Sequence, residues 1–233
     1  MSLYCIGDLH LSLSCDKPMD IFSGWDNYVE KLEKNLNILE EEDTLVILGD
    51  FSWAMDLKNA MKDFEFLNKF KGKKYFIKGN HDFWWTTKNK MKTFFEENGF
   101  VGMDIIQNNA VICEDKIICA TRGWYLDEQK GTENDKKILD REVLRLRMTL
   151  DEGKKLQEEN PEKEILLMLH YPPVYGDYKC EKILDVLKEY QVKKVFFGHI
   201  HGKNSRGGYK KYYDGIDYFM VSADMIDFEP MKI

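Results

Sequence analysis

The sequence is poor in the residues that staple small extracellular domains or build thiolate metal sites. Its 233 residues include only five cysteines, an odd number, and no Cys-x-x-Cys pair. This pattern argues against a disulfide framework and a structural zinc site, so we expect reduced and mostly buried thiols. The chain also lacks any apolar run of the roughly 18–20 residues that are needed to cross a bilayer.

An excess of positive charge is missing as well. Lys and Arg together number 34 against 41 Asp and Glu, for a net charge of −7. Proteins that bind the nucleic-acid backbone normally present a basic surface, so we expect no nucleic-acid partner. The opening MSLYCIGDLHL has neither the basic segment nor the long apolar stretch of a secretory signal. We therefore expect a cytoplasmic protein without a membrane partner, and the sequence leaves its oligomeric state open.

What the sequence does contain is an alternation of short apolar runs with segments of helical periodicity. Strands are expected at residues 3–6, 44–48, 74–77, 101–106, 110–113, 117–120, 165–169 and 195–197, with two or three more after residue 209. Helices are expected at residues 28–39, 57–70, 86–98, 132–159 and 179–190, the first of them opened by a capping box at residues 23–26. The alternation predicts one α/β domain over residues 1–233, with two sheets packed together.

All five histidines directly follow strand-like runs; they are His10, His81, His170, His199 and His201. Asp8, Asp50 and Asn80 stand at the same kind of position. Polar sites of parallel α/β sheets form beyond the carboxyl ends of the strands, so these residues are expected to meet in one crevice. In Asp8-x-His10 and His199-x-His201, residues two apart on extended backbone point the same way and can reach one metal.

Two carboxylates, one amide and at least four imidazoles make a mixed oxygen and nitrogen ligand set. Such a set suits first-row divalent metals such as Mn, Fe or Zn and does not suit Ca²⁺. Because the set is too large for one tetrahedral ion, two divalent ions are expected.

Five motifs carry a resemblance to a known family: GDLH, GDFSW, GNHD, LMLHYPP and GHIHG. They stand in the order found in the calcineurin-like metallophosphoesterase superfamily and span residues 8–201. The chain resembles a small bacterial-type predicted phosphohydrolase without an extra domain. The resemblance implies a four-layer αββα sandwich, in which two mixed β-sheets are flanked by helices.

The resemblance also implies a role for each motif residue. Asp8, His10 and His201 would hold one metal, Asn80, His170 and His199 the other, and Asp50 would bridge both. His81 would be catalytic, beside the leaving group. The implied reaction is hydrolysis of a phosphomonoester or phosphodiester of a small soluble substrate, by attack of a metal-bridging hydroxide.

The second motif departs from the pattern of protein Ser/Thr phosphatases, which read GDYVDRG where this chain reads GDFSWAMD. Trp53 and Ala54 replace the acid that supports the histidine and the arginine that grips phosphate, so a phosphoprotein substrate is not expected. Another carboxylate must then orient His81, and the candidates are Asp56, Asp82 and Asp224.

Three further residues are candidate substrate contacts. Arg122 follows a strand and can grip phosphate, or it is simply a surface group. Trp85 and Trp124 can stack on a nucleobase or aryl group, or they only wall the cleft. A helical insert near residues 130–160 is expected to cover that cleft. The alternatives left open are a nucleotide-type pyrophosphate hydrolase, a nuclease, and a non-catalytic metal-binding scaffold.

Overall fold

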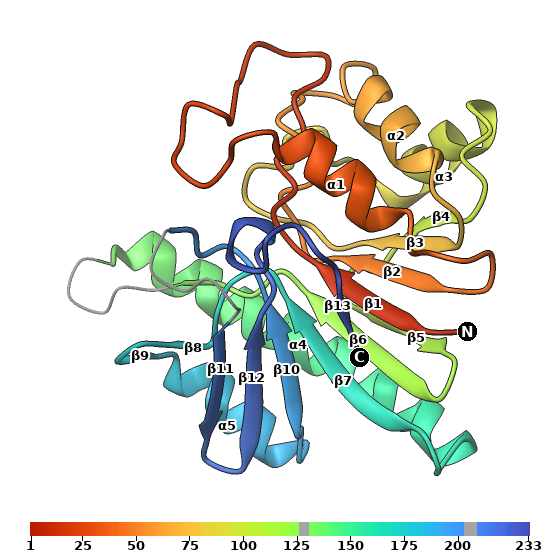
Figure 1. Cartoon of the computed structure of the whole chain (residues 1–233). Coiled ribbons are helices and arrows are strands. Elements are labelled where there is room, and N and C mark those ends of the chain that lie inside the picture. The colour runs from red at the N-terminus through yellow and green to blue at the C-terminus, as the bar shows by residue number, and fades with distance from the viewer. Residues whose placement is uncertain (126–130, 203–208) are drawn as a thin grey trace.

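Two β-sheets pack face to face in the computed structural model, which describes residues 1–125, 131–202 and 209–233 (Figure 1). The first sheet has the strand order β13-β1-β2-β3-β4. Its parallel strands are β1 (Leu3–Ile6), β2 (Thr44–Ile47), β3 (Lys73–Phe76) and β4 (Met103–Ile105). The edge strand β13 (Met231–Lys232) runs antiparallel to β1, so the sheet is mixed.

The second sheet is also mixed, in the order β11-β12-β10-β7-β6-β5. Its parallel strands are β6 (Lys116–Thr121), β7 (Glu164–Leu169), β10 (Lys194–Phe197) and β12 (Ile216–Met220). Antiparallel strands close both edges, β5 (Asn109–Cys113) and β11 (Tyr209–Tyr213). A small separate hairpin, β8 (Val174–Tyr175) with β9 (Tyr178–Lys179), lies in a stretch for which the sequence predicted no strand.

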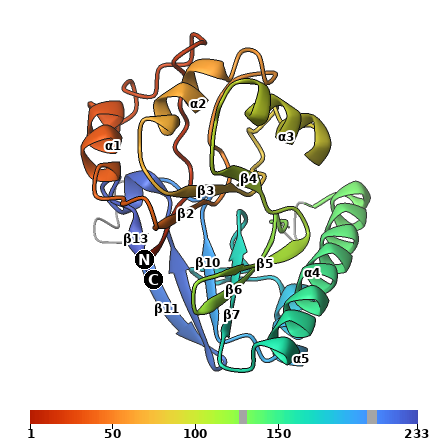
Figure 2. The ribbon, with the colours of Figure 1, turned by 90° about the vertical axis from the view of Figure 1, so that its right-hand side faces the viewer.

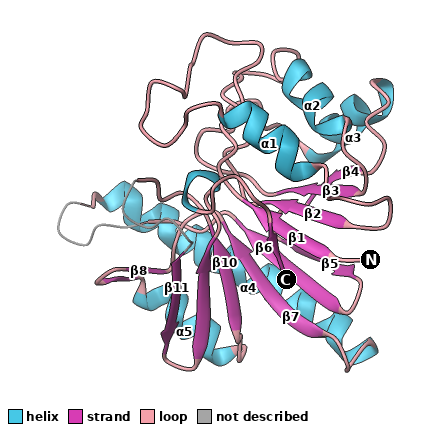
Figure 3. Cartoon of the chain, in the orientation of Figure 1, coloured by secondary structure: helices cyan, strands magenta, loops and turns pink. Residues whose placement is uncertain are grey.

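Helices cover the outer face of each sheet (Figures 2 and 3). The first sheet carries α1 (Tyr28–Leu36), α2 (Met61–Asn68) and α3 (Lys88–Glu97), and the second carries α4 (Glu133–Glu159) and α5 (Glu181–Glu189). Alternate residues of β2 show why the layers form. Leu45 and Ile47 belong to the core beneath the helices, whereas Val46 belongs to the core between the sheets. The four-layer α/β sandwich expected from the motifs is confirmed.

Two details of the helices differ from the sequence expectation. The capping box expected at residues 23–26 is wrong, because α1 begins after Asn27, which has a left-handed backbone and makes no side-chain cap. A genuine capping box opens α4, where Thr132 and Asp135 exchange hydrogen bonds. No described helix has both the length and the apolar content to span a membrane.

The long helix α4 forms the outer layer of the second sheet. It packs against β5 and β6, and also contacts β7 and α5. Leu139, Leu146 and Leu150 are buried in this contact. The expectation that this helix covers the active-site cleft therefore has no support from its packing, because its apolar side is occupied by the sheet.

Candidate metal centre

Strained backbone marks the strand ends that carry the motifs. Asp8, His10, Asp50 and His199 all have positive φ, between 46° and 72°. Non-glycine residues rarely adopt this left-handed conformation, which persists where the surrounding structure enforces it and is common at functional sites. The turn at each strand end therefore aims these side chains in directions that relaxed backbone would not allow.

Two glycines allow the backbone to approach the carboxylates closely. A Cβ atom on Gly79 would collide with Asp50 Oδ1, and one on Gly198 would collide with Asp8 Oδ2. The same closeness lets main-chain N–H groups hold the acids. The N–H of His199 donates to Asp8 Oδ2 at 2.8 Å, and the N–H of His81 donates to Asp50 Oδ1 at 2.7 Å. The glycines of GNH and GHIH are thus needed because a side chain at either position would occupy the space of a carboxylate, and not only because the chain turns there.

The first group of ligand atoms comes from β1 and β10. His10 Nε2 lies 3.2 Å from His201 Nε2, and His201 Nε2 lies 3.7 Å from Asp8 Oδ1. Asp8 Oδ1 is buried and has no hydrogen-bond partner. Asp224 Oδ1 lies 2.8 Å from His201 Nδ1 on the far side of the ring, which leaves Nε2 free to face Asp8 and His10.

The second group comes from β2, β3, β7 and β10. His170 Nε2 lies 2.7 Å from Asn80 Oδ1 and 3.5 Å from Asp50 Oδ2. His170 Nδ1 lies 2.9 Å from the Leu48 carbonyl oxygen, which fixes the tautomer with Nε2 unprotonated. The ring of His199 packs on that of Tyr171, with the ring centroids 4.4 Å apart.

Asp50 lies between the two groups. Its Oδ2 atom is 3.5 Å from His170 Nε2 and 3.7 Å from His10 Nε2. One carboxylate oxygen therefore faces a histidine of each group, as a bridging ligand must. All seven residues that the motifs nominated as ligands come together here.

The electrostatics of the site fit a pair of divalent cations. Burial raises the pKa of Asp8 to about 8 and also raises that of Asp50. Burial lowers the pKa of both His170 and His199 to about 3, and that of His10 well below its usual value. The rings of His10, His170 and His199 are thus held neutral. Ligand atoms lie within 4.8 Å of one another in the set Asp8, His10 and His201 and in the set Asp50, His170 and His199. Cations are the groups that such converging acceptors lack.

A cavity of about 530 Å³ opens over this centre. His10, Asp50, His199 and His201 line its floor together with His81. The apolar part of its wall comes from Met19, Phe22, Trp25 and Trp53, and Ser23, Gly202 and Asp224 complete the lining. The loop that supplies most of this wall is anchored by buried Asp63, which accepts hydrogen bonds from Leu13 N (2.9 Å) and from the Ser52 hydroxyl.

Comparison with known proteins agrees with this geometry. The model of the calcineurin-like phosphoesterase family matches residues 1–203. The chain belongs to this family. A search of curated proteins finds no match to the sequence.

Two solved structures match nearly the whole of this chain. A protein of Thermus thermophilus has a TM-score of 0.55 at 8% identity, with 99% of this chain and 97% of that chain covered. A protein of unknown function from Aquifex aeolicus has 18% identity and a TM-score of 0.47, with 99% and 95% covered. At 8% identity, the likeness to the Thermus thermophilus protein concerns the fold alone.

The three carboxylates nominated to orient His81 in this calcineurin-like phosphoesterase all have other partners. Asp224 holds His201, as described above, and its second oxygen accepts from Gly202 N at 3.1 Å. Exposed Asp56 accepts from the backbone and side chain of Asn59. These contacts do not involve the side chain of His81, so the expectation that one of the three orients it stays a prediction.

Asp82 has a structural task instead. Its buried carboxylate accepts from the N–H groups of Gly79 and Asp50 at 2.7 and 2.9 Å, from Phe51 N at 2.9 Å and from the Trp84 indole at 2.9 Å. Burial and the charge of Asp50 raise its pKa to about 7. Asp82 therefore ties the second motif to the third and holds Asp50 in place.

His81 itself is positioned by packing. Its ring lies on Trp53, with the ring centroids 4.3 Å apart, and Trp53 also stacks on His10 at 4.9 Å. Trp53, which stands where the protein phosphatases have the supporting acid, thus contacts His81 through its ring at an interplanar angle of 48°. The side chain of His81 remains free to face the cavity.

The three nominated substrate contacts lie away from the cavity over the metal centre. Trp85 is buried in the first core, with its ring 5.3 Å from that of Trp84. Trp124 packs on Tyr171 at 5.3 Å and beneath the guanidinium of Arg122 at 5.0 Å. Arg122 lines a smaller neighbouring cavity. The sequence missed Met19, Phe22 and Trp25, because they stand in a loop without periodicity.

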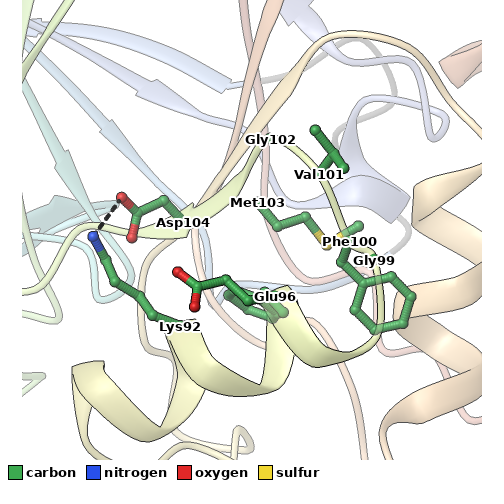
Figure 4. A pocket seen from close by; sticks show the side chains of 9 residues that line it. Lys92, Glu96, Gly99, Phe100, Val101, Gly102, Met103 and Asp104 are labelled. Atoms are coloured by element: carbon green, nitrogen blue, oxygen red, sulfur yellow. Dashed lines mark ion pairs between the residues drawn. The ribbon is translucent and has the colours of Figure 1, made fainter.

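A separate cavity of about 370 Å³ lies between the end of α3 and β4 (Figure 4). Phe95, Phe100 and Met103 line it beside an ion pair of Lys92 with Asp104 at 3.3 Å. None of the candidate ligands lines this cavity, so it takes no part in the metal centre.

Proposed function

We propose that this protein is a two-metal-dependent phosphoesterase that hydrolyses a monoester or diester of a small soluble substrate. The observation that carries the proposal is the position of Asp50 between two complete ligand groups, with His81 bound to it through the main chain. A non-catalytic scaffold would not need His81 to face the same cavity as both groups.

The residues divide the work as follows. Asp8, His10 and His201 would hold one divalent ion and Asn80, His170 and His199 the other, with Asp50 shared. Bound there, two such ions supply Lewis-acid stabilisation of the phosphate and lower the pKa of a water molecule. His81 gives a proton to the leaving-group oxygen, since it lines the cavity beside both ligand groups. Trp53 keeps its ring in the required orientation.

The wall of the cavity favours an apolar or aromatic leaving group. Phe22 is 53% exposed, although it lines a cavity otherwise walled by buried Met19 and Trp25 and half-buried Trp53. An exposed aromatic ring over a polar floor suits an aryl group or a nucleobase, which gains from burial and stacking. The net charge of −7 weighs against a long nucleic acid as substrate.

The test is hydrolysis by metal-free protein reloaded separately with Mn²⁺, Fe²⁺ and Zn²⁺. Aryl phosphomonoesters and diesters serve as substrates, and Asp50→Asn serves as the inactive control. We expect metal-dependent turnover that Asp50→Asn abolishes. Turnover with none of the metals, while two ions per chain bind, would favour the scaffold.

A further inference from the structure

A second, basic cavity of about 110 Å³ continues the row of strand ends beyond the metal centre. It lies at the ends of β3, β4 and β6, against the side of α4. In the first sheet β4 lies next to β3, and in the second sheet β6 lies next to β7. Candidate ligands follow both β3 and β7, so the basic cavity lies beside the strands that lead into the metal centre. The main-chain oxygen of Arg122 accepts from His170 N (3.1 Å) and Tyr171 N (3.0 Å), so the wall of this basic cavity also supports a metal ligand.

Positive charge dominates this basic cavity. Lys78, Arg122 and Arg145 line it, and Glu142 is the one carboxylate among the residues that do, which leaves a formal excess of two positive charges. In a chain whose net charge is −7, such an excess needs a reason. Like charges that converge in a half-buried space repel one another unless an anion joins them.

Glu142 holds the two guanidinium groups in place. Its side chain is only 1% exposed, with Oε1 2.5 Å from Arg145 Nη1 and 3.5 Å from Arg122 Nη2. Thr121 Oγ1, which donates to Asn108 Oδ1 at 2.9 Å, lies 3.4 Å from the other oxygen of Glu142. Arg122 also lies over the ring of Trp124, and its Nε is buried without a hydrogen-bond partner. A positioned guanidinium with an unused donor is the group that binds phosphate or carboxylate most readily.

The size of the basic cavity limits what it can bind. At about 110 Å³ it is about a fifth of the size of the 530 Å³ cavity over the metal centre, so it suits a single phosphate or carboxylate group better than a nucleobase or aryl ring.

We propose that the basic cavity lined by Lys78, Arg122 and Arg145 binds one phosphate or carboxylate group beside the metal centre. That group is either a second anionic group of the substrate or a free anion. Binding itself does not depend on the proposed function, whereas the kinetic comparison below rests on it.

The binding test is calorimetric titration of inorganic phosphate into the metal-free full chain, for the native protein and for Arg145→Gln. Arg147→Gln is the matched control, since Arg147 stands on the same helix with similar exposure and pairs with Glu189 at 2.7 Å away from this cavity. We expect Arg145→Gln to weaken phosphate binding at least about tenfold, as the loss of one charge-assisted hydrogen bond predicts, and Arg147→Gln to leave it unchanged. Equal binding by all three proteins, or none up to tens of millimolar phosphate, overturns the proposal.

A second variant guards against misfolding. If Arg145→Gln lowers the thermal midpoint of unfolding markedly, Lys78→Gln replaces it, since Lys78 also lines the cavity but follows β3 and does not belong to α4. Each variant removes one positive charge, so each is expected to weaken phosphate binding. Full binding in a folded Lys78→Gln and a folded Arg145→Gln alike contradicts the assignment.

The kinetic comparison identifies the source of the anion. The metal-loaded protein is assayed on an aryl phosphate with and without a ring carboxylate, and on a nucleoside 3′-phosphate with and without a 5′-phosphate. A substrate-borne group predicts a KM about tenfold lower for the doubly anionic partner, and Arg145→Gln removes that advantage. Equal KM values, with a response of the rate to added phosphate that Arg145→Gln removes and Arg147→Gln keeps, identify a free anion. Absence of turnover on every substrate counts against the proposed function, and the titration still decides on the cavity.

Discussion

The two ligand groups differ in how their histidines are held. In the group of Asp8, His10 and His201, the outermost histidine is oriented by a side chain, because Asp224 Oδ1 lies 2.8 Å from His201 Nδ1. In the group of Asn80, His170 and His199, the equivalent support for His170 is the main-chain oxygen of Leu48 at 2.9 Å. A side-chain support can be removed by a single substitution, whereas a main-chain support belongs to the fold itself.

Their exposure differs in the same sense. His201 is 32% exposed and His170 is fully buried. For His201, burial opposes the charged ring, but the bond to Asp224 and the nearby Asp8 carboxylate outweigh it and raise the pKa to about 9. Residues of both groups line the apolar cavity, but only the first group includes a histidine that depends on a partly exposed side-chain contact. Metal at the first group is expected to exchange more readily.

The largest effect is expected from Asp50→Asn. Asp50 faces both groups, so its substitution should weaken metal binding at both. The amide cannot supply the negative charge that faces His10 and His170. Because metal ions contribute several kcal/mol of charge stabilisation, kcat/KM should fall about 10³-fold. Elemental analysis should find fewer than two ions per chain. Unchanged metal content and unchanged activity would show that Asp50 bridges nothing.

A next, comparable effect is expected from His81→Asn, which belongs to neither group. Loss of a proton donor at the leaving group typically lowers turnover about 10²–10⁴-fold. Since the His81 contact with Asp50 is through the backbone N–H, metal content should stay at the native value. Steady-state kinetics with aryl and alkyl esters, together with elemental analysis, provide the check. A parallel loss of metal would mean that His81 is a ligand.

A smaller effect is expected from Asp224→Ala, which removes the side-chain support of the first group and leaves the main-chain support of the second group intact. Loss of a partner that orients a ligating histidine typically costs about 10–100-fold in metal affinity. The loss should be confined to one of two binding events in a metal titration, because the support of His170 is unaffected. Asp227→Ala is the control, since Asp227 is exposed and pairs only weakly with Lys31 at 3.8 Å. Equal weakening of both binding events would contradict the distinction drawn here.

The two packed sheets and the meeting of the seven candidate ligands could be predicted from local rules, whereas the four-layer order was implied by the family resemblance. Strands such as β2 are continuous apolar runs, and residues after parallel strands must share one edge. The hydrogen-bond partners of Asp82 and Asp224 could not be predicted from local rules. Asp82 follows His81 directly, yet its carboxylate turns back to Gly79 and Phe51, and Asp224 reaches His201 across 23 positions.

Such partnerships depend on how two sheets dock, which no local pattern encodes. The bridge between Gly7 and Ser222 is the contact that brings the end of β1 beside the residues following β12. The same dependence explains Trp85, whose aromatic character suggested a substrate contact although packing against Trp84 buries it. Residue type alone does not separate a core tryptophan from one in a cleft.

The smallest effect is expected from Phe22→Ala, which tests whether the first group indeed opens on an apolar site. Stacking of an aromatic pair contributes about 0.5–1.5 kcal/mol, so KM for aryl phosphates should rise roughly 2- to 10-fold. Turnover number and metal content should not change, because Phe22 contacts no ligand. Ile21→Ala is the matched control, since Ile21 is the adjacent residue, 71% exposed, and does not line the cavity. Alkyl phosphates should show no rise in KM, since they offer no ring to stack; a rise of equal size for alkyl and aryl esters would mean that the wall excludes water without selecting the leaving group.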